Sequence, residues 1–144
     1  MTNSAPFAAA PDNNRQPSRA LRIVVADDDR DAVLTLSVLL RHEGHEVREV
    51  YRGDTVYDQV REFQPDAVLL DIGMPGLTGL DVARKLRARL GDSCPLLVAI
   101  TAWDKGADRV LGQIAGFNHY LTKPYRTDAL LALLAPLVVS GRPL

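Results

Sequence analysis

The chain has 144 residues, of which 47% are hydrophobic and 24% are charged, and its formal net charge is -1 at pH 7. This length is typical of one domain, and the composition excludes a disordered, collagen-like or fibrous protein. The balance of 17 basic against 18 acidic residues argues against a protein that mainly coats nucleic acid or an anionic membrane. The single cysteine, Cys94, excludes a disulfide scaffold and favours a reducing, cytoplasmic compartment.

The N-terminal residues 1–20 are rich in Ala, Pro, Asn and Ser and show no periodicity, so we expect a flexible tail. The apolar stretch 6–11 is too short for the core of a signal peptide, and no positive charge precedes it. The longest apolar run, 129–139, is well short of the roughly 20 residues that a bilayer span requires. We therefore expect a soluble protein with no membrane partner.

Short apolar runs alternate with segments of helical periodicity along the rest of the chain. In chain order the predictions are strand 23–26 and helix 31–43, strand 45–51 and helix 55–63, strand 67–70 and helix 80–90, strand 96–100 and helix 104–115, and strand 118–121 and helix 128–139. Five such repeats predict an α/β protein, with a doubly wound five-stranded parallel sheet and five helices on its two faces. This domain would cover residues 21–140, leaving 141–144 as a C-terminal tail.

Polar residues follow the predicted strands where each one ends. Asp27 and Asp28 end the first strand, Asp71 the third, Thr101 the fourth and Lys123 the fifth. Because the carboxyl ends of parallel strands meet in the ligand crevice, three carboxylates, a hydroxyl and an ammonium group should converge. Carboxylates brought together repel one another unless a cation lies between them, and hard oxygen ligands suit Mg²⁺. Such a set is suited to phosphoryl transfer, with a carboxylate as the nucleophile.

Four segments of the chain, each at a strand end, carry a resemblance to a known family. They are 23–29 (IVVADDD), 66–79 (DAVLLDIGMPGLTG), 99–102 (AITA) and 116–124 (GFNHYLTKP). In this order they resemble the receiver domain of two-component response regulators, over about residues 21–140, and they are similar to single-domain chemotaxis regulators. The resemblance implies the flavodoxin-like receiver fold.

The resemblance also implies an acceptor residue and a metal site. Asp71 would be the phosphoacceptor. Asp28 would bind Mg²⁺ directly, and Asp27 would assist through the water shell of the metal. Asp71 itself and the backbone carbonyl of Gly73 would complete the ligand set.

A second group of residues would respond to phosphorylation. Thr101 and Ala102 would bind the phosphoryl group, Lys123 would pair with another of its oxygens, and Tyr120 would be an aromatic switch that moves inward with Thr101. Pro124 occupies the usual cis-proline position of the family, which would orient the lysine. Two residues depart from the commonest family pattern: Gly73 has no side chain to orient the hydrolytic water, and Trp103 is large enough to cover the site.

The predicted last helix is apolar around much of its circumference. Leu130, Leu133, Leu134 and Leu137 can form a core stripe, which leaves the residues on the other side without polar character. We therefore predict a homodimer or partner contact there. The interface residues would be Leu131, Ala135 and Val138.

The most consistent interpretation is a signalling switch. A histidine kinase or phosphotransfer protein would phosphorylate Asp71, and the modified domain would bind a downstream protein. It would not be an enzyme beyond its own phosphoryl transfer and slow dephosphorylation. The length leaves no room for an output domain, so we expect the signal to leave through a protein surface, with no nucleic acid partner. The alternatives are a constitutive receiver-fold interaction module without phosphorylation, and a true phosphatase.

Overall fold

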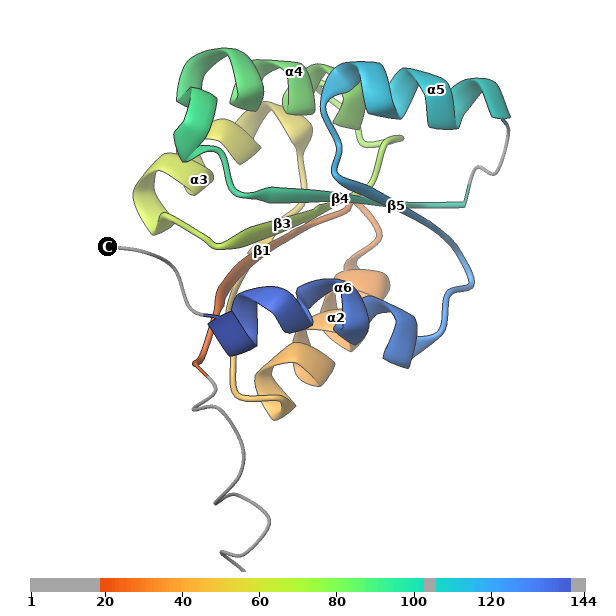
Figure 1. Ribbon diagram of the computed structural model, residues 1–144. Coiled ribbons are helices and arrows are strands. Elements are labelled where there is room, and N and C mark those ends of the chain that lie inside the picture. Colours follow the sequence, from red (N-terminus) through yellow and green to blue (C-terminus); the bar gives the residue numbers. More distant parts are fainter. Residues whose placement is uncertain (1–18, 103–105, 141–144) are drawn as a thin grey trace, which may run out of the picture.

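Five parallel strands form one sheet in the order β2-β1-β3-β4-β5 (Figure 1). The computed structural model describes residues 19–102 and 106–140. The strands are β1 (Arg22–Ala26), β2 (Glu46–Val50), β3 (Ala67–Leu70), β4 (Leu96–Thr101) and β5 (His119–Thr122). β1 lies between β2 and β3, so the chain order reverses beside β1, and the carboxyl ends of β1 and β3 are neighbours.

Helices cover both faces of the sheet. They are α2 (Arg30–His42), α3 (Val56–Phe63), α4 (Gly79–Leu90), α5 (Gly106–Ala115) and α6 (Thr127–Ser140), with short 3₁₀ turns at η2 (Gly53–Thr55) and η3 (Gly91–Ser93). Figure 1 shows α2 and α6 on one face and α3, α4 and α5 on the other. The predicted doubly wound architecture is therefore confirmed.

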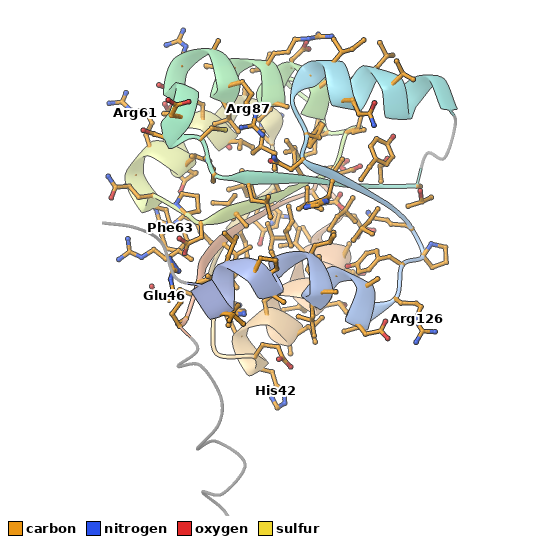
Figure 2. All side chains as sticks on the ribbon, viewed as in Figure 1. His42, Glu46, Arg61, Phe63, Arg87 and Arg126 are labelled. Atoms are coloured by element: carbon orange, nitrogen blue, oxygen red, sulfur yellow. The ribbon has the colours of Figure 1, made fainter. Side chains whose placement is uncertain are left out.

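The two faces of the sheet bury two hydrophobic clusters, one under each layer of helices. Alternate residues of β1 supply them: Val24 and Ala26 pack on the α3/α4 side, whereas Ile23 and Val25 pack on the α2/α6 side. Because both faces are covered, the central strands read as continuous apolar runs without polar alternation. Figure 2 shows carbon-rich side chains filling both layers, with charged residues such as Glu46 and Arg126 on the outside.

Local signals in the sequence place the helix ends. Asp29 caps α2, because its carboxylate accepts hydrogen bonds from the backbone N–H groups of Asp31 and Ala32. Thr78 caps α4 in the same way by accepting from the N–H of Asp81. Gly44 follows α2 with a φ of 96°, the left-handed conformation that stops a helix.

The predicted boundaries differ from the structure by small amounts. Thr55, the first residue of the segment predicted as helix 55–63, is the last residue of the 3₁₀ turn η2, and α3 covers the rest of that segment. β4 extends by one residue to Thr101. The helix predicted from residue 104 is described from Gly106, and its first two predicted residues lie outside the described residues. α6 continues through Pro136. Among the described residues, no helix is both long and apolar enough to cross a bilayer.

Candidate functional site

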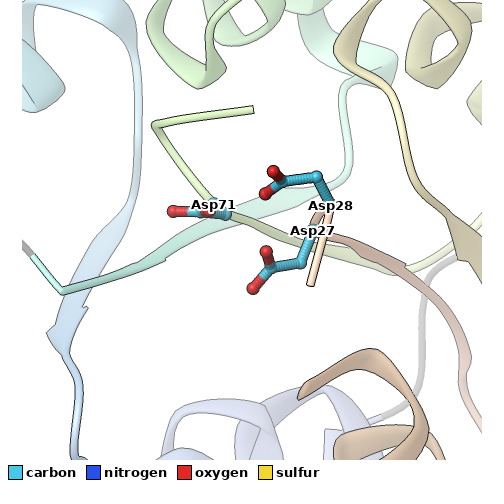
Figure 3. Close-up of side chains that lie close together, drawn as sticks. All are labelled: Asp27, Asp28 and Asp71. Carbon is cyan, nitrogen blue, oxygen red and sulfur yellow. The ribbon is translucent and has the colours of Figure 1, made fainter. Parts of the chain in front are cut away.

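Three carboxylates from two neighbouring strand ends meet at the carboxyl edge of the sheet. Asp27 and Asp28 follow β1 and Asp71 follows β3; each offers an oxygen, and these oxygens all lie within 4.8 Å of one another (Figure 3). The strand pairing produces this geometry, since Ala26 lies beside Leu70 and the N–H of Asp71 donates to the carbonyl of Ala26 at 2.9 Å. The three carboxylates expected from the strand ends therefore lie together.

Asp27 is the most buried of the three carboxylates, and it forms an ion pair with the ammonium group of Lys123. Its side chain is 8% exposed, and its Oδ2 accepts a hydrogen bond from Lys123 Nζ at 2.7 Å. Its Oδ1 accepts from the backbone N–H of Asp29 at 3.0 Å. Asp28 is exposed, so it faces solvent at the mouth of the cluster. A buried carboxylate with both oxygens bonded forms a rigid side of the site.

Asp71 occupies an electrostatically unfavourable position. Burial, followed by the negative charge of Asp27, raises its pKa to about 6, although the N–H of Gly73 and the ammonium of Lys123 act in the opposite direction. The Gly73 N–H donates to Asp71 Oδ1 at 3.3 Å. A carboxylate held in this way gains from any cation that binds beside it.

Lys123 is partly buried and paired with negative charge. Burial lowers its pKa, but the hydrogen bond to Asp27 and the charges of Asp27, Asp71 and Asp29 outweigh that effect and raise it. The ammonium group is therefore charged at neutral pH. The Lys123–Pro124 peptide is cis, as the resemblance implied, and the Lys123 N–H donates to the carbonyl of Thr101 at 2.7 Å.

The remaining predicted site residues lie on the neighbouring strands. Thr101 ends β4 with a buried side chain, and the exposed Ala102 follows it. Tyr120 lies in β5, half-buried against the cluster on the α3/α4 side of the sheet. Gly73 is exposed in the loop after Asp71. Trp103 lies outside the described residues.

The loop that follows Asp71 is held in place by two close backbone approaches. The N–H of Gly79 donates to the carbonyl of Ile72 at 2.8 Å, and a Cβ at Gly79 would lie 2.6 Å from the Cα of Ile72. The N–H of Gly53 donates to the carbonyl of Pro75 at 3.1 Å, and a Cβ at Gly53 would collide with the carbonyl oxygen of Leu77. Glycine is required at both positions, so the acceptor loop has a defined path.

Sequence reasoning missed one residue beside the cluster, Tyr125. A narrow pocket between the sheet and α2 has Asp27, Asp71, Lys123 and Tyr125 as its polar lining. Burial, offset by the charge of Lys123 and reinforced by that of Asp27, raises the pKa of Tyr125. Its position directly after Pro124 was the available signal, but the chain direction after a cis peptide cannot be read from sequence.

The residues of the predicted interface on α6 differ in how exposed they are. Leu130 and Leu134 are fully buried, while Leu131 and Val138 are half-buried against the same cluster. Ala135 is exposed. The backbone N–H of Arg19 also donates to the carbonyl of Val138 at 3.2 Å. Only part of the predicted apolar surface is therefore open to a partner.

The acidic set at the carboxyl edge is chemically suited to a divalent cation. Three carboxylates supply hard oxygen ligands within a small space, and one of them is exposed so that an ion can enter. The cluster could therefore hold a metal ion, and the loop carbonyls beside Asp71 are further oxygen donors.

Comparison with known proteins identifies close relatives. A family model described as the response regulator receiver domain matches residues 23–135. The response regulator MprA of Mycobacterium avium is 40% identical over 123 residues, which are 85% of this chain and 53% of that protein. MprA of Mycolicibacterium vanbaalenii is 42% identical over 123 residues, which are 85% of this chain and 52% of that protein. The chain spans about half the length of the curated relatives it matches.

Solved structures agree with this comparison. The BeF₃-activated N-terminal receiver domain of Klebsiella pneumoniae RstA has a TM-score of 0.76 at 28% identity, covering 83% of this chain and 99% of that one. The signal receiver domain of a response regulator from Bermanella marisrubri has a TM-score of 0.74 at 31% identity, covering 83% and 98%. The chemotaxis protein CheY4 of Vibrio cholerae, at 20% identity and a TM-score of 0.76, covers 83% and 100% and supports the fold alone.

Proposed function

The chain belongs to the response regulator receiver domain family, and from this premise we propose that Asp71 accepts a phosphoryl group from a phosphohistidine in a Mg²⁺-dependent reaction. Phosphorylation-dependent switching is the standard function of this family, whose members interact with histidine kinases and downstream effectors. The observation that carries the proposal is the position of Asp71, half-buried beside the Asp27 carboxylate and close enough to the Lys123 ammonium for the charges of both to act on it.

The transfer step uses Asp71 as the nucleophile. A carboxylate oxygen of Asp71 attacks the phosphorus of the donor phosphohistidine, a new O–P bond forms, and the N–P bond breaks. The imidazole nitrogen leaves with the electron pair of that bond. When bound, Mg²⁺ neutralises charge on the carboxylates and the phosphoryl oxygens. Asp27, Asp28, Asp71 and the carbonyl of Gly73 are the residues that would hold it.

Lys123 has one partner before phosphorylation and another after it. In the free protein it pairs with Asp27 at 2.7 Å. A dianionic phosphoryl group on Asp71 offers it a stronger partner at the same edge of the sheet. Thr101 and the backbone of Ala102, at the end of the adjoining strand β4, supply the remaining contacts to the phosphoryl oxygens.

The change at β4 is passed to Tyr120 in the neighbouring strand. β4 and β5 are paired so that Ala99 lies beside Tyr120 and Thr101 beside Thr122. Movement of Thr101 toward the phosphoryl group makes room for the Tyr120 ring to turn inward. The phosphoryl group biases this two-state packing through its different contacts in the two states.

The output is a protein surface. We place the receiver domain at residues 21–140 and the site of action in the cytoplasm, with a downstream protein as the partner and neither nucleic acid nor membrane bound by this domain. A homodimer through α6 would use Leu131, Ala135 and Val138. The domain catalyses only its own phosphoryl transfer and slow dephosphorylation.

Labelling with radioactive acetyl phosphate tests the proposal. The chain should acquire an acid-labile label in the presence of Mg²⁺ and none with EDTA. Asp71→Asn should abolish the label, since an amide is not a nucleophile at this pH. Asp58→Asn is the control, because Asp58 is an exposed carboxylate of α3 outside the cluster.

Two results would contradict the proposal. A label that persists in Asp71→Asn would mean that another residue is the acceptor. A folded, Mg²⁺-binding chain that takes no label would favour the constitutive interaction module. Steady turnover of a generic phosphate ester would indicate a phosphatase instead.

A further inference from the structure

Three cations surround one tyrosine ring on the face of the sheet covered by α3 and α4. The ring belongs to Tyr57 of α3, which is half-buried against the core. Lys85 Nζ lies 4.9 Å from the ring centroid, and the guanidinium carbons of Arg89 and Arg61 lie 5.3 and 5.8 Å from it. Figure 2 labels Arg61 on this side of the sheet.

Among the residues whose side chains the structure describes, no carboxylate balances this group of cations. No ion pair joins Arg61, Lys85 or Arg89 to any of those acidic side chains. Two neighbouring acids are engaged elsewhere: Glu62 pairs with Arg48 at 2.6 Å, and Asp81 pairs with Arg84 at 3.5 Å. The ring attracts each cation through its negative face, but the cations repel one another. An anion placed among them would be attracted by all three.

A groove with an apolar floor adjoins the cations. It lies between the end of α3 and the turn after α4, and its apolar lining is Val60, Pro65, Leu90 and Pro95. Arg61 belongs to both features, since it lines the groove and contacts the Tyr57 ring. The surface therefore combines a small hydrophobic hollow with a positively charged border.

We infer that this α3/α4 surface binds an acidic, amphipathic segment of a partner protein. Carboxylates of the segment would lie against Arg61, Lys85 and Arg89, and an apolar side chain would enter the groove beside Leu90. The cations form one compact group rather than the stripe that follows a phosphate backbone, and the groove beside them has the apolar residues Val60, Pro65, Leu90 and Pro95 in its lining. These features favour a peptide over a nucleic acid.

The surface is separate from the phosphoryl site. The groove residues Pro65 and Pro95 precede β3 and β4, so they lie at the amino ends of the strands. The carboxylates lie at the opposite, carboxyl ends. The inference therefore does not rest on the proposed function, and the Asp71→Asn protein should bind the segment as the unmodified protein does.

A short synthetic peptide of glutamates with two leucines at i and i+4 is the probe. Backbone amide shifts measured by NMR should change in α3, α4 and the turn after α4, and added NaCl should weaken the binding. A matched peptide with glutamine at every glutamate should bind much more weakly. A single-stranded oligonucleotide, measured in the same way, tests whether this surface binds a nucleic acid instead.

Two arginines of α4 provide a matched pair of variants. Arg89→Gln should weaken peptide binding by about threefold, the effect typical of one exposed charge, and Arg61→Gln/Lys85→Gln/Arg89→Gln should abolish it. Arg84→Gln removes the same charge from the same helix but from a side chain paired with Asp81, so binding should be unchanged. Circular dichroism checks that each variant is folded.

Three outcomes would overturn the inference: no shift at about 1 mM peptide, equal weakening by Arg84→Gln and Arg89→Gln, or stronger perturbation of this face by the oligonucleotide than by the acidic peptide.

Discussion

The molecule carries two groups of like charges, and they are built in different ways. The carboxylates of Asp27, Asp28 and Asp71 project from strand ends whose positions are set by backbone pairing, and Asp27 is buried. The cations around Tyr57 are instead long side chains on two helices, with their charged ends near solvent.

This difference determines what repulsion costs in each group. The short side chains of Asp27 and Asp71 follow paired strands and have little room to separate, so their repulsion lowers the stability of the fold until a cation binds. The cations can change rotamer and spread into water, where like charges interact weakly. Removing a charge should therefore have a large effect in the first group and a small effect in the second.

The largest effect is expected from Lys123→Met. This change leaves the buried Asp27 carboxylate without its ammonium partner at 2.7 Å, which should lower the free energy of unfolding by about 2 kcal/mol in EDTA at neutral pH. The Lys123 pKa is raised, so its contribution is fully present at neutral pH and is lost only in alkali. Urea denaturation measures the change.

Lys85→Met is the matched control from the Tyr57 group. It should change the free energy of unfolding by less than about 0.5 kcal/mol, because Lys85 is a partly exposed cation with no carboxylate partner among the side chains that the structure describes, and such a charge contributes little. The double variant Asp27→Asn/Lys123→Met removes both charges of the pair. It should recover most of the free energy of unfolding that Lys123→Met loses. Equal effects of the two lysine substitutions would refute the contrast between the two groups.

A smaller effect of the opposite sign is expected from Asp71→Asn. The raised pKa of Asp71, about 6, means that its charged form destabilises the fold at neutral pH. Discounted for its partial exposure, neutralisation should raise the free energy of unfolding by about 1 kcal/mol in EDTA.

Metal addition should then reverse the order of stability. Mg²⁺ should raise the melting temperature of the unmodified protein and have little effect on Asp71→Asn. The repulsion would not be assigned to the Asp71 carboxylate if Asp71→Asn were less stable than the unmodified protein in EDTA. The same would follow if Mg²⁺ raised the melting temperatures of both proteins equally.

The smallest effect is expected from His45, a partly buried group that lies outside both groups of like charges. His45 Nδ1 accepts a hydrogen bond from the Leu21 N–H at 3.0 Å. Burial lowers the pKa of His45, although the facing carboxylates Glu43 and Asp66 act to raise it. The unfolded chain takes up a proton more readily than the fold does, so stability should fall as pH drops through about 6.5.

His45→Asn preserves an acceptor at this position but does not titrate. The difference in unfolding free energy between the two proteins should therefore shrink as the pH is lowered. Parallel pH profiles for the two proteins would show that His45 does not contribute.

Much of the fold could be predicted because its signals are local. Short apolar runs such as 67–70 and 96–100 are typical of a strand that is buried on both faces. Asp29 and Gly44 mark the ends of α2 by side-chain capping and by a positive φ. Local signals did not predict the 3₁₀ turn η2 that comes directly before α3, because this turn depends on how Gly53 packs against the acceptor loop.

The candidate site could be predicted in part. Its acidic members were expected to meet because parallel strands share a carboxyl edge, and Asp27, Asp28 and Asp71 do lie together. The pairing of Lys123 with Asp27, and the place of Tyr125 beside them, could not be predicted. Both depend on the path of the chain after β5 and on side-chain packing against α2.

The amino-acid sequence by itself determined the repeating β-α order, the parallel sheet and the residues at each strand end, because periodicity and capping act within a few residues. Only the tertiary structure decided which charges are buried and which charges meet. It placed one carboxylate against an ammonium group 96 residues away in the chain, and it gathered three cations from two helices around one ring. Burial and long-range proximity are properties of the packed chain, and they set the energies of the carboxylates at the strand ends and of the cations around Tyr57.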